Sequence, residues 1–370
     1  MPATPSTIYG IGSVTKSFTA LAVMQLVERG LLSLDDPVDK YLPVELKPFG
    51  ESVTLEHLLT HSSGVPALAY AEALINGVVE EGEAWLPLAN PEDVIPFMRG
   101  ASEWAVARPG ERFFYLNEGY VLLGLTVSKV SRMGYREYVR RNVLEPLGMK
   151  RTFFEKELLE SDPDRATLYL LRDGRPKPAR FPFTLTSDGG LLSNVLDLSK
   201  YLAIHIARGK AGDSEILAGS SVEEMERGRI AVPWRVFGDE KYGLGWIVTW
   251  NFYGRKLVHH SGSVLVYTAF AGYLPEEGVG VAVLANAAGY SPYKVGTYAL
   301  ALALGEDPGQ LPFVKLERLV RRIEGEYEAF KGTMKATVKE EGACSTLTSA
   351  GGKYPSSPRK AATRRLSSTR

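Results

Sequence analysis

The chain has 370 residues, of which 45% are hydrophobic, so it is long enough for one large domain or two ordinary ones. Lysine and arginine together number 43, as do aspartate and glutamate, and this balance does not favour a nucleic acid or a membrane surface as a partner. The single cysteine, Cys344, excludes an intrachain disulfide and a thiolate metal cluster, and no apolar run approaches the roughly 18 residues of a membrane span. With no recognisable signal peptide, we expect a cytoplasmic protein without a metal or another cofactor.

Helical patterns dominate the first two hundred residues. The pattern over 14–29 predicts a largely buried helix, and Gly30 suits its C-terminal cap. Residues 54–64 predict a second, shorter helix that begins with a threonine cap. Two consecutive helices are expected in 117–146, and an amphipathic helix is expected over 196–209.

Sequence rich in β-forming residues begins after Tyr242. Four short runs follow, "GLGWIVTW", "RKLVHHSGS", "YTAFAGYLP" and "VGVAVLANA", and the short turns between them predict an antiparallel meander. A helix over 293–305 would return onto this sheet. Helices that flank an antiparallel sheet define an α+β fold rather than a doubly wound one.

The C-terminal region has a different character. Residues 321–340 predict a connector that enters a first β-strand. Residues 343–370 contain six basic and no acidic residues, show no periodicity and have few apolar side chains, so they predict disorder. The loss of amphipathic pattern inside an apparent strand indicates a second domain that is cut short.

The stretch "YGIGSVTKSF", residues 9–18, places Ser13 three positions before Lys16. A serine hydroxyl is a weak nucleophile that needs a base in contact, and positions i and i+3 of a helix share a face. If a helix begins near Ser13, its backbone N–H also stands at the positive end of the helix dipole, where it can bind an oxyanion. Taken alone, the pattern fits a serine cap followed by an exposed lysine better.

A second polar pair lies in "PGERFFYLNEGYVLLG", residues 109–124, where Tyr115 and Asn117 flank one residue of an extended segment and can point the same way. A tyrosine beside a protonated lysine can act as a general base, and the Asn117 amide can bind Lys16 or a substrate carbonyl. The alternative is a core tyrosine followed by an asparagine cap.

A third segment, "LVHHSGS", residues 257–263, lies in a β-rich run. His260 would place a titratable group there, and the bare backbone at Gly262 would let a substrate pair as an added strand. His259 and His260 must point to opposite faces, and a third ligand at suitable spacing is lacking, so the pair does not predict a metal site.

Together, Ser-x-x-Lys, Tyr-x-Asn and His-x-Gly in this order resemble the penicillin-recognising serine hydrolases, which share a β-lactamase/transpeptidase-like fold. This group includes class C β-lactamases, other penicillin-binding-protein-like enzymes, D-aminopeptidases and the CubicO-like esterases and peptidases. The resemblance extends from about Ile8 to Leu304. Further stretches match in the same order, namely "TLEHLLTHSSGVP", "VLEPLGMKRT", "SDGGLLSNVLDLSKYL" and "YGLGWIV".

The resemblance implies that Ser13 is the acylated nucleophile and that Lys16 and Tyr115 share the acid–base catalysis. Asn117 would orient Lys16 and the substrate amide. His260, counted with the catalytic residues, occupies the position of a lysine in β-lactamases.

The resemblance also implies that Ser261, Gly262 and Ser263 bind substrate. The backbone N–H groups of Ser13 and Ser263 would form the oxyanion hole. His61, within a motif that the family carries away from the chemistry, is expected to be structural.

The sequence departs from the family pattern at two places. Histidine at position 260 removes a permanent positive charge, which argues against a dedicated β-lactamase or a strict carboxypeptidase. Only twelve residues precede Ser13, whereas the family has a helix and two strands there, so the N-terminal strands are expected to be missing and the sheet to have an exposed edge.

Within the family, "EGEYEAFKGTMKATVKE" resembles the first strand of a lipocalin-type barrel carried by CubicO-like archaeal peptidases. Such peptidases accept peptides that contain D-amino acids and can assemble into closed oligomers, so a homo-oligomer is an expectation here. We expect a serine hydrolase domain over 1–310, with an all-helical lobe beside the sheet, a linker and the start of an aborted barrel over 311–342, and a disordered basic tail over 343–370.

The sequence thus predicts a serine peptidase that acts on peptide or ester substrates through an acyl-enzyme on Ser13. Two alternatives stay open. The chain could be a carboxylesterase or weak β-lactamase of the same fold, or an inactive, truncated product.

Overall fold

The computed structural model describes residues 2–79, 90–172, 174–183, 185–212, 214–289, 291–328, 331, 335–341, 344–349 and 352–356. The chain divides into two compact units, Met1–Glu306 and Asp307–Arg370. Each unit is described by itself.

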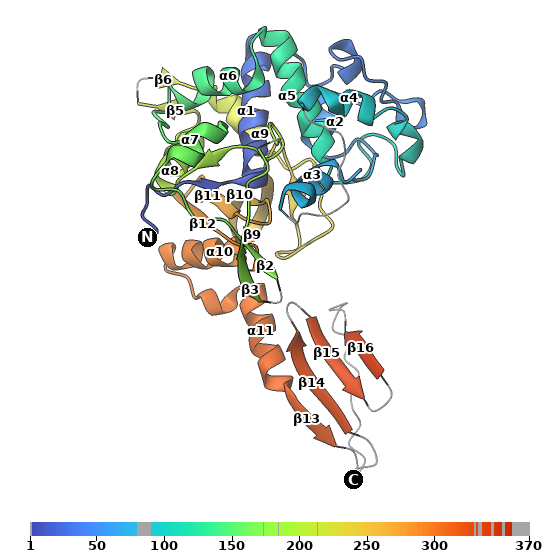
Figure 1. The fold of residues 1–370 in the computed structure, drawn as a ribbon, viewed down its shortest axis with the longest axis vertical. Helices are drawn as coiled ribbons and strands as arrows, with labels where there is room; N and C mark the ends of the chain where they lie inside the picture. The colour runs from blue at the N-terminus through green and yellow to red at the C-terminus, as the bar shows by residue number, and fades with distance from the viewer. Residues whose placement is uncertain are drawn as a thin grey trace. The chain divides into compact units, whose positions relative to one another are not determined.

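The centre of the first unit is an antiparallel sheet with the strand order β12-β11-β10-β9-β8-β7, of which Figure 1 labels β9 to β12. The four β-rich runs predicted from the sequence form its β9–β12 meander. Along β10 the side chains alternate between faces, so His259 and His260 point to opposite sides, as predicted. The strands are β7 (Ile230–Ala231), β8 (Lys241–Tyr242), β9 (Ile247–Phe252), β10 (Arg255–Ser263), β11 (Thr268–Leu274) and β12 (Val279–Ala285).

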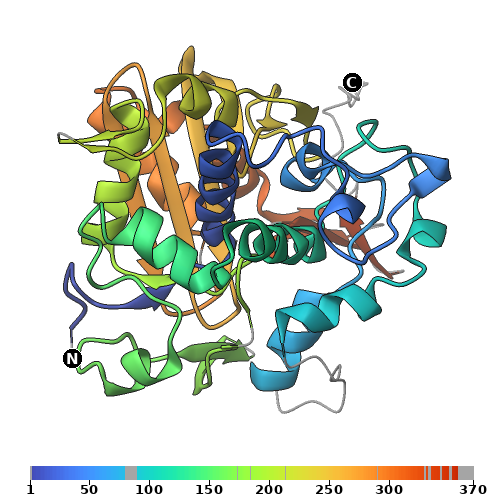
Figure 2. The same cartoon turned by 90° about the horizontal axis from the view of Figure 1, so that it is seen from above.

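Helices cover both faces of this sheet. On one face, Tyr293 of α10 (Pro292–Ala303) packs on His259 and Phe270, with ring centroids 5.4 and 5.8 Å away. On the other face, His205 of α8 (Val195–Ile206) stacks on Tyr273. The same face carries α1 (Thr15–Glu28), which Figure 2 shows in dark blue between the sheet and α5 (Asn117–Ser131). This layered arrangement confirms the α+β prediction.

Helix α1 is buried on all sides, with every side chain from Thr15 to Leu26 removed from solvent. A helix that is apolar around its whole circumference belongs in a core, and its few polar side chains then need partners inside the protein. Gly30 follows α1 with a φ of 68°, the left-handed geometry of the predicted glycine cap.

An all-helical lobe lies beside the sheet and packs around α5. Its α2 begins at a capping box in which Thr54 accepts the His57 N–H while His57 Nδ1 accepts the Thr54 N–H, at 3.3 and 3.2 Å. The helices of the lobe and its surroundings are α2 (Leu55–Leu59), α3 (Tyr70–Val79), α4 (Val94–Phe97), α6 (Tyr135–Val139), α7 (Lys156–Ser161) and α9 (Gly219–Met225). Three short pairs of strands complete this unit: β1 (Tyr9–Gly10) with β4 (Leu192–Ser193), β2 (Tyr169–Arg172) with β3 (Arg175–Pro178), and β5 (Lys210–Ala211) with β6 (Ser214–Glu215).

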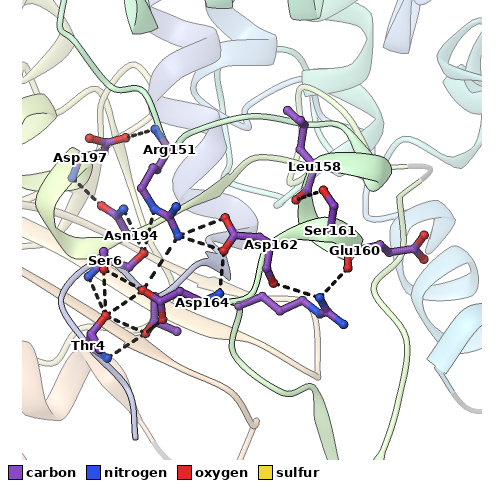
Figure 3. Close-up of polar contacts among 12 residues, drawn as sticks. Thr4, Ser6, Arg151, Leu158, Glu160, Ser161, Asp162, Asp164, Asn194 and Asp197 are labelled. Carbon is purple, nitrogen blue, oxygen red and sulfur yellow. Dashed lines mark hydrogen bonds and ion pairs between the residues drawn. The ribbon is translucent and has the colours of Figure 1, made fainter. Parts of the chain in front are cut away.

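The segment before β1 is fixed by a polar network (Figure 3). The hydroxyls of Thr4 and Ser6 donate to the Asp164 carboxylate at 2.9 and 2.7 Å. Arg151 and Asn194 both donate to the Ser6 carbonyl, at 3.2 and 3.3 Å. The chain therefore enters the turn that carries Ser13 from an anchored position.

The second unit contains α11 (Pro312–Ile323) and a sheet with the order β13-β14-β15-β16. The strands are β13 (Gly325–Glu328), β14 (Lys335–Glu341), β15 (Cys344–Ser349) and β16 (Gly352–Ser356). Composition predicted disorder from residue 343, whereas β15 and β16 pair with β14 and with each other, because backbone pairing needs no apolar side chains. The other residues of the predicted tail, 343, 350–351 and 357–370, lie outside the described residues.

The sheet of the first unit has β12 at one end, and the residues of β12 are partly exposed, as is usual for an edge strand.

None of the helices in the described ranges has the length and apolar character that crossing a membrane needs.

Candidate active site

Ser13 lies in a tight turn, Gly12–Val14, directly before α1. Gly12 has a φ of 51°, and a Cβ there would meet the Ser263 backbone nitrogen at 2.7 Å. Only glycine combines this backbone angle with such a close approach. The turn therefore brings Ser13 against the end of β10, although the two lie about 250 residues apart in the chain.

Lys16 lies one turn further on, and its side chain is fully buried. Its Nζ donates to Ser13 Oγ at 3.1 Å, to Asn117 Oδ1 at 2.8 Å and to the Asp188 backbone carbonyl at 2.6 Å. Three acceptors match the three protons of an ammonium group. The predicted contact between Ser13 and Lys16 is thus present, and two further groups fix the lysine.

Tyr115 and Asn117 flank Leu116, which has extended backbone angles and precedes the first turn of α5. Both side chains contact Lys16. Its Nζ lies 4.9 Å from the centre of the Tyr115 ring and 2.8 Å from Asn117 Oδ1. Asn117 turns its Oδ1 to Lys16 and its Nδ2 towards Glu72 of α3, at 3.5 Å. The structure therefore brings together Ser13, Lys16, Tyr115 and Asn117.

His260 lies on the face of β10 opposite to α10, and its ring nitrogens contact Tyr242 and Ser261 rather than Ser13. Its Nε2 lies 2.8 Å from the Tyr242 hydroxyl, and its Nδ1 lies 2.6 Å from the Ser261 carbonyl. Because a carbonyl can only accept, Nδ1 carries the proton and Nε2 accepts from Tyr242. Burial, helped by the charge of Lys16, lowers the pKa of His260 to about 3. The residue is therefore a neutral imidazole, and both of its nitrogens are in use.

The end of β10 supplies backbone to the site. A Cβ on Gly262 would meet the Ile11 carbonyl at 2.0 Å and the Ser13 nitrogen at 3.0 Å. The bare side of Gly262 thus accommodates the Gly12–Val14 turn, and its predicted role in substrate binding stays a prediction. Ser261 is partly exposed and Ser263 is exposed, and both line the same cavity as Ser13.

This cavity has a volume of about 690 Å³. Apolar side chains form most of its wall, including Leu185, Trp234, Val264 and Tyr293. Glutamate and aspartate are present among its described lining residues, whereas lysine and arginine are not. Elsewhere too, within the described ranges, no group of three or more His, Cys, Asp or Glu side chains is placed to hold a metal ion.

Sequence reasoning missed two contributors to the site. The Asp188 carbonyl binds Lys16, but a backbone acceptor leaves no signature in side-chain identity; the "SDGG" turn was the only available signal. His61 was expected away from the chemistry, yet its ring stacks on Tyr115 with centroids 4.1 Å apart.

Glu118 lies next to Asn117, and its buried carboxylate accepts the Tyr70 N–H of α3 at 3.0 Å. Burial raises the pKa of Glu118 from 4.5 to about 7. The folded protein therefore holds a proton that the unfolded chain has already released, and the stabilisation present below pH 4.5 is lost as the pH rises towards 7. From pH 5 to pH 8, we expect the free energy of unfolding of the wild type to fall by about 2–3 kcal/mol more than that of Glu118→Gln, which has no carboxyl group to ionise at this position.

Urea denaturation across this pH range, with wild type and Glu118→Gln in parallel, measures the difference. Glutamine keeps an acceptor for the Tyr70 N–H, so the comparison isolates the ionisation. Identical pH slopes in the two proteins would contradict a raised pKa at Glu118.

The fold and this constellation define a class of protein: the chain belongs to the β-lactamase family, whose family model matches residues 1–305. A second model, the Pab87 octamerisation domain, matches residues 308–362. Among solved structures, the chain is similar to the octameric penicillin-binding protein homologue from Pyrococcus abyssi, with 54% identity, a TM-score of 0.90, and coverage of 96% of this chain and 79% of that one.

Two further relatives extend the comparison. A penicillin-binding protein from Bacillus halodurans is 30% identical, with a TM-score of 0.67 and coverage of 82% of this chain and 87% of that one. The protein flp of Staphylococcus aureus (strain MW2) is 28% identical over 294 residues, which cover 77% of this chain and 54% of flp. The chain spans about half the length of the curated relatives it matches.

Proposed function

We propose that the protein is a serine hydrolase that forms an acyl-enzyme on Ser13 and cleaves peptides, including peptides that contain D-amino acids. The observation that carries this proposal is the 3.1 Å contact between Lys16 Nζ and Ser13 Oγ at the wall of the cavity. A buried lysine held by Asn117 and Asp188 is suited to placing a fixed charge beside a nucleophile.

In the proposed reaction, Ser13 Oγ attacks the substrate carbonyl carbon and its proton passes to Tyr115, with Lys16 stabilising the charge. The backbone N–H groups of Ser13 and Ser263 bind the oxyanion that forms. The proton then moves to the leaving amine as the C–N bond breaks. Water then attacks the Ser13 ester and gives a proton to Tyr115, and that proton passes to Ser13 Oγ as the ester C–O bond breaks and the acid is released.

The walls of the cavity support a substrate that is apolar around the reacting bond and does not need a carboxylate. His260 is neutral, and the described lining contains no lysine or arginine to pair with an anion. Glu72 adds a negative charge at the rim. These features favour neutral or cationic peptides over the carboxylate-bearing β-lactams.

The proposal is tested with a fluorophosphonate probe and three substrates. We expect the probe to label the peptide that contains Ser13, as located by mass spectrometry. We expect turnover of a D-amino-acid p-nitroanilide and of an aryl ester, and slower turnover of a cephalosporin. Absence of labelling, or faster turnover of the cephalosporin than of the p-nitroanilide, would overturn the proposal.

We further propose that the chain forms a homo-oligomer through its second unit. This segment matches an octamerisation domain, and the solved structure from Pyrococcus abyssi is described as octameric. In addition, α11 exposes Leu316, Leu319 and Ile323, which are 43%, 53% and 41% accessible and share one side of the helix.

Leu319→Glu is expected to lower the molar mass in solution, because it places a charge in the apolar face that would be buried between copies. Light scattering coupled to size exclusion measures the mass. The matched control is Arg318→Glu at the neighbouring exposed position. A Leu319→Glu protein with the mass of the wild type would contradict the role of this face.

A further inference from the structure

His61 follows α2 and is buried beside the proposed active site. The role inferred below for this histidine depends on the proposed function of Ser13 and Tyr115. His61 contacts three consecutive residues of the segment that carries Tyr115. Its carbonyl accepts the Phe114 N–H at 2.8 Å, its Nδ1 accepts the Leu116 N–H at 3.0 Å, and its ring stacks on Tyr115 at 4.1 Å with an angle of 30° between the planes.

These contacts fix both the backbone and the ring of the proposed base. Two hydrogen bonds on either side of Tyr115 leave its backbone little freedom, and the stacked imidazole limits rotation of the ring. Lys16 Nζ lies 4.9 Å from the centre of the same ring. The imidazole of His61 and the ammonium group of Lys16 are therefore the nearest ring and cation to Tyr115, while Phe113 and His260 lie further away, at 6.4 and 6.5 Å between ring centroids.

The protonation of His61 suits this position. Because Nδ1 accepts from Leu116, a neutral ring carries its proton on Nε2. Burial, together with the charge of Lys16, holds the pKa of His61 well below its usual range. The ring thus stays uncharged and adds no second cation next to Lys16.

The backbone at His61 is also unusual, with a φ of 57°. Non-glycine residues are uncommon in this left-handed region, although histidine enters it more readily than most. Gly64 belongs to the same loop and has a φ of 84°. A Cβ there would meet the Ala107 carbonyl oxygen at 2.0 Å, so only glycine fits where the loop passes this carbonyl.

We propose that His61 is a positioning residue that holds the Tyr115 hydroxyl in register with Ser13 and Lys16. The substitution His61→Asn tests this, because asparagine tolerates the left-handed backbone and its Oδ1 can still accept the Leu116 N–H, but it has no ring to stack. We expect the rate of fluorophosphonate labelling and kcat for the p-nitroanilide to fall about 10-fold or more, with little change in KM.

A double-mutant cycle with Tyr115→Phe separates positioning from a general structural effect. Phenylalanine keeps the stacked ring and removes only the hydroxyl. If His61 acts through that hydroxyl, His61→Asn should change the residual labelling rate of the Tyr115→Phe protein by less than about 2-fold. An equal loss in both backgrounds would overturn the proposal.

His57→Asn is the matched control, since His57 Nδ1 also accepts a backbone N–H, that of Thr54. It should leave the labelling rate unchanged. A second variant, His61→Phe, restores the ring without the Nδ1 acceptor and should retain more activity than His61→Asn when both are compared below their melting temperatures. The reverse order would assign the effect to the hydrogen bond and reject positioning by the ring.

The NMR resonances of the Tyr115 ring, assigned by their loss in Tyr115→Phe, give a readout independent of catalysis. Their line shapes should show faster flipping of the Tyr115 ring in His61→Asn, because the stacked imidazole that limits its rotation is gone. If wild type is not labelled at Ser13, the proposed function fails; if it is labelled and the cycle is additive, only the role of His61 fails.

Discussion

Ser13→Ala is expected to abolish fluorophosphonate labelling and to lower peptide hydrolysis by at least about 10⁴-fold. The substitution removes the atom that would form the ester, and no other hydroxyl shares its contact with Lys16 among the described hydrogen bonds. KM should change little, because Ser13 is one residue among many that line the cavity. Intact-protein mass spectrometry and turnover of the p-nitroanilide measure the two effects.

Ser17→Ala is the matched control on the same helix. The Ser17 hydroxyl is buried and donates to the Val14 carbonyl at 2.8 Å, so its loss should reduce stability by about 1 kcal/mol and leave the labelling rate intact. A Ser13→Ala protein that still hydrolysed the p-nitroanilide at the rate of the wild type would reject Ser13 as the nucleophile.

Lys16→Met is expected to lower the rate of labelling by about 10³-fold while the protein remains folded. Methionine fills a similar volume but supplies no charge beside Ser13. The substitution lowers the free energy of unfolding by less than the lost hydrogen bonds alone would suggest. The Asn117 Oδ1 and Asp188 carbonyl lose their donor, at about 1–3 kcal/mol each, whereas the removal of a buried charge offsets part of that loss.

Labelling kinetics and urea denaturation on the same samples separate the two effects. Lys200→Met is the control, because Lys200 also donates to a backbone carbonyl, that of Gly148, and to a carboxylate, that of Asp197, but lies outside the cavity. Its labelling rate should equal that of the wild type. If Lys16→Met were labelled as fast, the lysine would have no part in activating Ser13.

Local spacing accounts for the parts of this site that the sequence predicted. Ser13 and Lys16 are three positions apart at a helix start, so helix geometry alone brings them into contact. Tyr115 and Asn117 were recognised because an extended residue between them turns both side chains the same way. The antiparallel meander was predictable because short turns leave adjacent strands few other ways to pair.

Contacts that depend on tertiary packing could not be predicted. The hydrogen bond from Tyr242 to His260 joins β8 and β10, whose relative register is set through β9. The bare side of Gly262 meets the Ile11 carbonyl, which only the approach of two distant segments explains. His61 lies on Tyr115 because of the path of one loop, and its sequence motif does not specify its neighbour.

The partners of Lys16 also make the site a reporter of folding. Asn117 lies 101 positions and Asp188 172 positions along the chain from the lysine, so its environment exists only when distant parts of the unit have come together. Proteins rich in contacts of large sequence separation fold slowly, because loop-closure entropy opposes such contacts until they form. Under the proposed chemistry, a nascent or partly unfolded chain would have no reactive serine. The time at which a refolding sample first accepts the probe would therefore mark completion of the native tertiary structure.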